Sequence, residues 1–315
     1  MAPLIRTHHR LACLVAALLG CACSDAIAQT SDILWRNTRT GANVIWKGGD
    51  FRVIQAVPAA STNWEVIGTA RSSYSGDTSL IWRNSNDGRV LAWVNAQTDY
   101  TAYLPIDRRW TLAGTGFFDT DTHACDFLWR DATGQNMLWR WGLDAADPLI
   151  AVANMDWEIA GIGDFDGDVY SDILWRNKAD GRNVIWLRGD ARHLRSVTAV
   201  TNLAWRIVGV GDFDGDDVDD ILWRESKTGR NVVWNWARAG AYARTLVTAP
   251  TLSWHVVGVG DFNTDGKSDV LWRDAATGRN VIWSGADGRQ VIPVARVPDQ
   301  AWVVAAVGDF TPRGW

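Results

Sequence analysis

Acidic residues recur at alternate positions in three short segments of this chain. Counted from Asp164, aspartates stand at positions 1, 3, 5 and 9, and the pattern returns in 211–224 and, with one Asn, in 260–273. Oxygen ligands at alternate positions of a tight loop suit a hard cation such as Ca²⁺, so about three Ca²⁺ sites are predicted. The predicted ligands are Asp164, Asp166, Asp168 and Asp172; Asp212, Asp214, Asp216 and Asp220; and Asp261, Asn263, Asp265 and Asp269.

Two other interpretations of these segments must be weighed. An EF-hand loop has similar spacing, but it needs a Glu at position 12 and a following helix, whereas here an apolar, strand-like run follows. The segments could also be Asp-Gly turns that merely cap strands. Position 6 often requires a positive φ, which Gly266 adopts readily and the β-branched Val169 resists, so the site at Asp164 departs from the pattern and is less secure than the others.

Three further copies of the segment have lost ligands. The second copy carries no acid at its four ligand positions, which are Arg71, Ser73, Ser75 and Ser79, and is predicted to be metal-free. In the third copy Phe117 replaces the first acid, and the acids that remain, with one residue inserted, are Asp119, Asp121 and Asp126. In the last copy Asp309 and Asp32 survive, but Arg313 stands at position 5. The sequence leaves metal binding by these last two copies open.

Tryptophan shows the period of the repeat. Eighteen of the 21 tryptophans fall into three series of six, spaced 46 to 49 residues apart, which is the length of a four-stranded propeller blade. The first series is Trp35, Trp82, Trp129, Trp175, Trp223 and Trp272. The second series is Trp46, Trp93, Trp139, Trp186, Trp234 and Trp283. The third series is Trp64, Trp110, Trp157, Trp205, Trp254 and Trp302.

The repeats predict an all-β, six-bladed propeller of four-stranded antiparallel blades. No segment keeps a 3.6-residue period, so very little helix is expected. The chain begins inside one repeat, at Ser31, and ends inside another, after Trp302, and the two pieces make one complete repeat. The final blade should therefore take its first strand from the C-terminus and three strands from the N-terminus, which closes the ring without an open edge.

These repeats resemble the FG-GAP/VCBS family, known from the propeller of integrin α subunits and from bacterial secreted proteins. The resemblance covers about residues 31–310, and it is carried by 210–216 together with Asp220-Ile221-Leu222 and their counterparts. It implies a propeller with Ca²⁺ in the loop that joins the first and second strands of some blades. It implies no single activity, because the family includes adhesins, lectin-like proteins and scaffolds of some polysaccharide lyases.

The N-terminus has the features of an export signal. A basic start, the apolar run 11–20 and the small residues before Gln29 predict that residues 1–28 are a signal peptide and that 29–315 form one propeller domain. The run is too short for a permanent transmembrane anchor. The alternative is a lipid-modified Cys21. The protein is thus expected to be secreted, periplasmic or on the cell surface, and Cys125 is the only cysteine outside the leader.

Charge and motifs limit the function classes. Without the leader the formal charge moves from −5 to −6, and basic runs are missing, which argues against nucleic acid as a partner. No Ser nucleophile elbow, HExxH or phosphate-binding loop is present. We therefore expect a monomeric, non-catalytic module that binds a glycan or an extracellular protein. The alternatives are a polysaccharide-acting enzyme and a purely structural envelope protein.

Other signals have structural and functional interpretations. Trp141 and Trp236 fall outside the three series and are candidate stacking surfaces for a ligand. The six arginines that follow the first-series tryptophans are expected to stack on neighbouring rings between blades rather than to bind glycans. Arg188-Gly189-Asp190 spells the tripeptide that integrins recognise, but the equivalent Gly48-Gly49-Asp50 indicates an ordinary turn.

Overall fold

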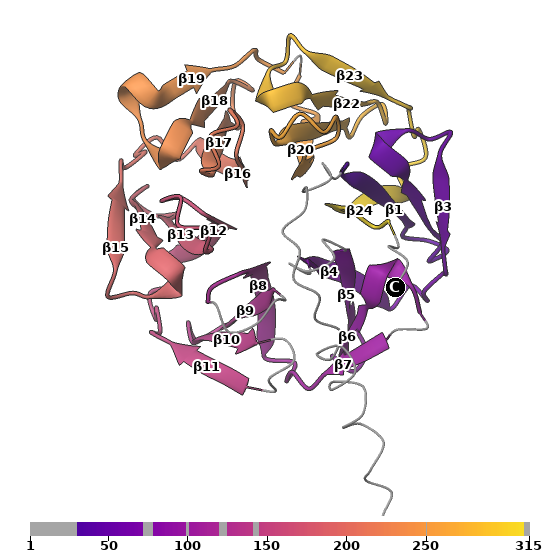
Figure 1. Ribbon diagram of the computed structural model, residues 1–315, viewed down its shortest axis with the longest axis horizontal. Helices are drawn as coiled ribbons and strands as arrows, with labels where there is room; N and C mark the ends of the chain where they lie inside the picture. The colour runs from indigo at the N-terminus through magenta and orange to yellow at the C-terminus, as the bar shows by residue number, and fades with distance from the viewer. Residues whose placement is uncertain are drawn as a thin grey trace, which may run out of the picture.

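The computed structural model describes residues 30–71, 78–98, 101–119, 125–140, 145–249 and 251–311. These residues form six four-stranded antiparallel sheets arranged in a ring, each sheet with one strand near the axis and one at the rim (Figure 1). The predicted six-bladed propeller is confirmed.

The strands of each blade are given from the axis outward. Blade 1 contains β24 (Trp302–Gly308), β1 (Asp32–Asn37), β2 (Asn43–Trp46) and β3 (Ile54–Val57). Blade 2 contains β4 (Trp64–Arg71), β5 (Thr78–Asn84), β6 (Val90–Trp93) and β7 (Thr101–Leu104). Blade 3 contains β8 (Trp110–Gly116), β9 (Asp126–Asp131), β10 (Asn136–Arg140) and β11 (Ala145–Leu149).

The second half of the ring follows the same plan. Blade 4 contains β12 (Trp157–Gly163), β13 (Asp172–Asn177), β14 (Asn183–Trp186) and β15 (Leu194–Val197). Blade 5 contains β16 (Trp205–Gly211), β17 (Asp220–Glu225), β18 (Asn231–Trp234) and β19 (Ala243–Thr245). Blade 6 contains β20 (Trp254–Gly260), β21 (Asp269–Asp274), β22 (Asn280–Trp283) and β23 (Val291–Val294).

The helical elements of the described residues are single 3₁₀ turns. They are η1 (Lys47–Gly49), η2 (Val94–Ala96), η3 (Leu187–Gly189), η4 (Asn235–Ala237), η5 (Gly240–Tyr242) and η6 (Ser284–Ala286). All but η5 directly follow the third strand of a blade. In the part of the chain that the structure describes, no helix has the length and apolar character needed to cross a bilayer.

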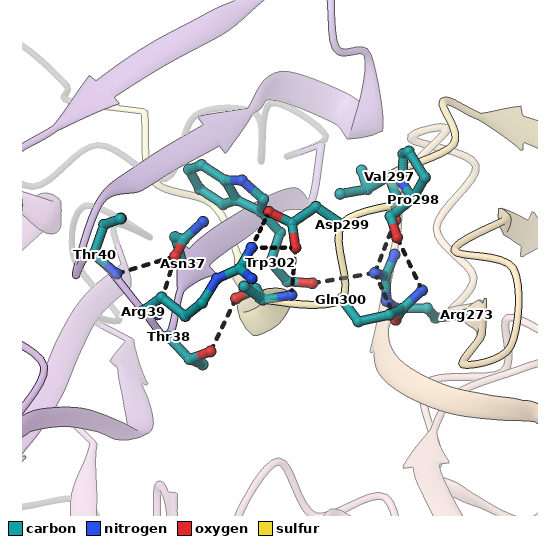
Figure 2. A network of polar contacts seen from close by, with 11 residues as sticks. Asn37, Thr38, Arg39, Thr40, Arg273, Val297, Pro298, Asp299, Gln300 and Trp302 are labelled. Carbon is teal, nitrogen blue, oxygen red and sulfur yellow. Dashed lines mark hydrogen bonds and ion pairs between the residues drawn. The ribbon is translucent and has the colours of Figure 1, made fainter.

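The two ends of the chain close the ring as predicted. Strand β24 pairs antiparallel with β1, from Asp32 opposite Gly308 to Asn37 opposite Trp302. Figure 2 shows the junction between blades 6 and 1, where Arg39 forms an ion pair with Asp299 at 2.7 Å. Because blade 1 is built from both ends, it has four strands like every other blade, and the ring closes without an incomplete blade.

The space between blades is filled by the first-series tryptophans and the arginines that follow them. All six of these indoles are almost fully buried. Each arginine lies over the indole of the next blade, and the series closes on itself when Arg273 lies 5.0 Å from the ring of Trp35. The other five pairs are Arg36–Trp82, Arg83–Trp129, Arg130–Trp175, Arg176–Trp223 and Arg224–Trp272. The structural interpretation of these arginines is confirmed.

The inner strands pack closely because glycine removes side chains where blades meet. A Cβ at Gly258 would lie 2.3 Å from the side chain of Val307 in the next blade. The residue before the second strand also joins blades through the backbone: the amide of Asp219 donates to the carbonyl of Asp164 at 2.6 Å, and Ser31 donates likewise to Asp261. These backbone contacts join each loop to the neighbouring blade and do not depend on a bound ligand.

Candidate metal centre

The acidic loops share one face of the propeller with the 3₁₀ turns. In a four-stranded meander, the connection between strands 1 and 2 and the connection between strands 3 and 4 leave from the same end of the sheet. The acidic loops are the first of these connections, and η1, η2, η3, η4 and η6 begin the second. Apolar strands follow the loops, namely β13, β17 and β21, so the EF-hand alternative is excluded.

The aspartate at position 9 fastens each loop to the 3₁₀ turn of its blade. In blade 5 the carboxylate of Asp220 accepts hydrogen bonds from the amides of Phe213 at 3.1 Å and Trp236 at 2.9 Å. Asp172 and Asp269 make the same two contacts in blades 4 and 6. All three are completely buried. Each oxygen keeps a second lone pair for a cation, so these residues both fasten the loop and remain candidate ligands.

The aspartate at position 1 orders the loop from inside. In blade 5 both oxygens of Asp212 accept backbone hydrogen bonds, with Gly215 at 2.7 Å and Asp217 at 2.9 Å. Positions 4 and 6 of all three loops have positive φ, including 69° at Val169 and 61° at Thr264. Both of these residues are β-branched, so blades 4 and 6 each hold one strained position, whereas the sequence pointed only to Val169.

The loop of blade 5 fits a cation best. One oxygen from each of Asp212, Asp214 and Asp216 lies within 4.8 Å of the others. Oδ1 of Asp214 is buried without a hydrogen-bond partner, and so is Oδ1 of the neighbouring Asn235. An unpaired buried oxygen is costly, and a hard cation would satisfy several at once. The donor set is entirely oxygen, as Ca²⁺ requires.

The loop of blade 4 brings together a different set. One oxygen from each of Asp164, Asp166 and Asp172 lies within 4.8 Å of the others. Asp168 is turned toward Arg188 of η3, with 2.7 Å between Nε and the carboxylate oxygen. The Arg188 side chain is 49% exposed, so this ion pair competes with a cation from the solvent side.

The loop of blade 6 is the least acidic of the three. The Asn263 amide donates to Asp265 at 3.0 Å and to the Ser284 hydroxyl at 2.8 Å. Ser284 also donates to Asp265 at 3.4 Å. These contacts hold Asn263, Asp265 and Ser284 side by side.

Burial shifts the pKa values of the loop carboxyls. Desolvation raises the pKa of Asp172 and that of Asp220 to about 7. Burial and the repulsion of neighbouring carboxylates also raise the pKa of Asp214. Carboxyls that resist ionisation when metal-free gain most from a bound cation, because its charge offsets the lost hydration.

Blades 1 and 3 keep the aspartate at position 9 but fewer of the other acids, whereas blade 2 has Ser79 at position 9. In blade 1 the Asp32 carboxylate accepts hydrogen bonds from the amides of Phe310 and Gly48. These are the counterparts of the two backbone contacts of Asp220 in blade 5. The third contact of Asp32 is with the Lys47 ammonium. In blade 3 Asp126 accepts from Phe118, and Asp119 forms an ion pair with Arg140. Ser73, Ser75, Asp121 and Arg313 lie outside the described residues.

Trp236 lies directly against the blade 5 loop. Its side chain is 37% exposed, and its indole N–H donates to Asp216. Tyr242 stacks beside it, with ring centroids 6.1 Å apart, and the Arg238 guanidinium lies over both rings. Trp141, which follows the second-series Trp139 as Trp236 follows Trp234, lies outside the described residues, as do the leader and Cys21.

The remaining sequence signals have local explanations. The Asp190 carboxylate pairs with Arg192 and His193, and Gly189 is buried, so the turn at Arg188-Gly189-Asp190 matches that of Gly48-Gly49-Asp50. The opposite face has a depression of ≈ 460 Å³ whose lining includes Tyr103, Asp107 and Arg108. Cys125 is buried, which raises the pKa of its thiol to about 11.

Sequence reasoning missed the residue that follows each second-series tryptophan. Asn235 and Ser284 contact acidic loops in blades 5 and 6, and Lys47 and Arg140 do so in blades 1 and 3. The signal was available, because these residues occupy one column when the six repeats are aligned on their tryptophans.

No protein-family model and no curated protein matches this chain. Solved structures with a similar fold include BBS1N in complex with ARL6DN, at 13% identity and a TM-score of 0.46, covering 87% of this chain and 84% of that one. Regucalcin, a calcium-binding protein from Agrobacterium tumefaciens, is similar at 9% identity and a TM-score of 0.48, covering 74% and 73%. Oligogalacturonate lyase from Vibrio parahaemolyticus is similar at 11% identity and a TM-score of 0.46, covering 86% and 74%. At these identities the likeness concerns the propeller fold alone.

Proposed function

We propose that this protein is an exported, calcium-binding propeller whose acidic-loop face binds a glycan or an extracellular protein without catalysing a reaction. The observation that carries the proposal is the contact between Trp236 and Asp216, which joins an exposed aromatic side chain to a candidate Ca²⁺ loop. The resemblance to FG-GAP/VCBS repeats supports the same assignment and stays a sequence-based prediction.

Calcium is the cation that best suits the three loops. Ca²⁺ accepts six to eight oxygen ligands in a flexible geometry, whereas Mg²⁺ demands a near-ideal octahedron and keeps several waters. Each loop offers carboxylate or amide oxygens at positions 1, 3, 5 and 9. When bound, the ion supplies charge compensation and order to the loops.

A glycan is the partner that the aromatic cluster favours. Trp236 and Tyr242 form a stacked pair with Arg238 beside them, and an aromatic face with nearby charged groups can stack on a sugar ring and hydrogen-bond its hydroxyls. The cluster depends on the blade 5 loop for its position, because the indole N–H is held by Asp216. Calcium binding at that loop would therefore fix the orientation of Trp236.

A glycan array with the purified protein, in Ca²⁺ and in chelator, tests this proposal. We expect Ca²⁺-dependent binding that Trp236→Ala abolishes. Tyr103→Ala is the matched control, because Tyr103 is an exposed aromatic on the outer strand of blade 2. Loss of binding in both variants, or binding independent of Ca²⁺, would contradict the proposed surface. Release of shortened chains from a bound polysaccharide would reassign the protein to the enzyme alternative.

Export is tested by the mass of the protein recovered from the producing cells. We expect a chain that begins at Gln29. A lipid on Cys21 would instead place the protein on a membrane through an acyl anchor.

A further inference from the structure

One column of the repeat begins the connection between the third and fourth strands in all six blades, and in blades 1, 3, 5 and 6 it contacts acids or ligand positions of the loop. It is the residue directly after the second-series tryptophan, and the pairing register is the same each time, with Trp46 opposite Ile33 and Trp234 opposite Ile221. The column contains Lys47, Val94, Arg140, Leu187, Asn235 and Ser284 in blades 1 to 6. Two of its members have basic side chains, two have a neutral side-chain oxygen, and two are aliphatic.

The two cations occur in the blades whose loops keep only some of their acids. In blade 1, Lys47 contacts the buried carboxylate of Asp32, and its ammonium also donates to the Thr311 hydroxyl at 2.6 Å. In blade 3, Arg140 forms an ion pair with Asp119, the position 3 acid, and bonds Asp147 at 2.6 Å. Both basic side chains are about four-fifths buried, with 22% and 21% of their surface exposed.

The two members with a neutral side-chain oxygen, Asn235 and Ser284, occur in blades with predicted Ca²⁺ loops. Asn235 donates its amide N–H to Asp214, which leaves Oδ1 of both residues buried and unpaired. Ser284 contacts Asn263 and Asp265 in blade 6. A neutral oxygen at this place can serve as a ligand, and it leaves the loop charge for an external cation to balance.

The two aliphatic members, Val94 and Leu187, supply neither a charge nor an oxygen. Val94 belongs to blade 2, where positions 1 and 9 are Arg71 and Ser79, so the described ligand positions carry no acid. Leu187 belongs to blade 4, where the loop charge is left to a cation and is partly met at the surface by the next residue, Arg188.

We propose that this column determines how the acidic loops of blades 1, 3, 5 and 6 are neutralised. In blades 1 and 3, Lys47 and Arg140 are permanent cations in place of a metal ion. In blades 5 and 6, Asn235 and Ser284 are additional oxygen ligands for Ca²⁺. A like-charged carboxylate cluster is unfavourable until a cation lies among its oxygens, and a lysine ammonium or a metal ion both meet that need. The Ca²⁺ half of this inference rests on the proposed function, whereas the permanent-cation half does not.

The test moves the lysine of blade 1 into blade 5. We expect full-length Asn235→Lys to bind one Ca²⁺ fewer than the wild type by calorimetric titration with calcium chloride. Its melting temperature in chelator should rise above that of the wild type, because the new ammonium neutralises Asp214. Val94→Lys introduces the same lysine in a blade without the acids. It should leave the Ca²⁺ count unchanged and should not raise the melting temperature in chelator.

A reciprocal variant tests the permanent cation directly. Lys47→Met should lower the melting temperature in chelator, and Lys47→Arg should restore it. An Asn235→Lys protein that keeps the full Ca²⁺ count, or a Lys47→Met protein as stable as the wild type, would overturn the inference. If the wild type binds no Ca²⁺, the proposed function fails, and the chelator measurements on Asn235→Lys and Lys47→Met still decide the permanent-cation half.

Discussion

The loops of blades 4 to 6 and the described parts of the loops of blades 1 and 3 share the aspartate at position 9 but differ in their other acids. Asp32 of blade 1 and Asp220 of blade 5 make the same pair of backbone contacts, so these contacts do not depend on a full set of acids. The residues at positions 1, 3 and 5 differ between the two groups of blades, and so does the residue that directly follows the second-series tryptophan. The carboxylate at position 9 is therefore structural, whereas the carboxylates at positions 1, 3 and 5 need a cation to balance their charge.

Chelation of Ca²⁺ should have the largest effect on stability. With a Kd near 0.1 mM and roughly 1 mM Ca²⁺, each site adds about 1.4 kcal/mol to the free energy of unfolding, and three sites add about 4 kcal/mol. That is a large share of a net stability of about 5–15 kcal/mol. We expect a clearly lower melting temperature in chelator, restored by excess Ca²⁺. An unchanged melting temperature would remove the distinction between the two halves of the ring.

Substitution at position 9 should destabilise both kinds of blade. Asp220→Ala leaves the amides of Phe213 and Trp236 without a partner, and each buried unpaired group costs about 1–3 kcal/mol. Asp32→Ala should be destabilising for the same reason. Denaturant titration in chelator measures both losses. Only Asp220→Ala should also lower the Ca²⁺ count, and an Asp32→Ala protein as stable as the wild type would refute the shared framework.

Substitution at position 3 should separate the two kinds of blade. Asp214→Ala should remove about a third of the Ca²⁺-dependent stabilisation, about 1.4 kcal/mol, because one of three sites loses its ligand. The matched variant Asp119→Ala should change stability equally with and without Ca²⁺, because Arg140 is the partner of Asp119. Thermal melts of both variants in Ca²⁺ and in chelator decide this. Equal Ca²⁺ dependence of the two losses would contradict the assignment.

Calcium affinity should fall as the pH falls below 7. Burial raises the pKa of Asp172 and Asp220 to about 7, so at pH 6 a proton occupies each carboxyl about ten times more often than not. Affinity at each of these loops should then be about tenfold weaker than at high pH. The stability of the Ca²⁺-free protein should change with pH in the opposite direction to the Ca²⁺ affinity. The folded state binds these protons more tightly than the unfolded state, so the free energy of unfolding should fall as pH rises from about 4 to 7. Titration calorimetry and melts across this range check both.

The smallest expected effect is a gain in affinity at blade 4. Arg188→Ala frees Asp168 from its ion pair, so Ca²⁺ should bind that loop a few-fold more tightly. Arg192→Ala, which removes an exposed arginine paired with Asp190, is the control and should leave Ca²⁺ affinity unchanged. Weaker binding by Arg188→Ala would mean that the arginine supports the site instead of competing with it.

Much of the fold could be predicted because it depends on local repetition. The tryptophan period, the acidic spacing and the complementary ends at Ser31 and Trp302 led to six closed blades. Contacts between the loop and the turn that follows the third strand were missed, although the column is visible in the aligned repeats, because Lys47 and Asp32 are 15 residues apart and meet only in the folded register. The positive φ of Thr264 was also missed, since threonine gives no sign of a left-handed conformation.

The most direct test of the account is the number of Ca²⁺ ions bound per chain. Equilibrium dialysis or calorimetry on the wild type, Asp214→Ala and Asp119→Ala measures it. We expect about three ions for the wild type, about two for Asp214→Ala and about three for Asp119→Ala. No bound Ca²⁺ in the wild type, or the loss of an ion in Asp119→Ala, would contradict it.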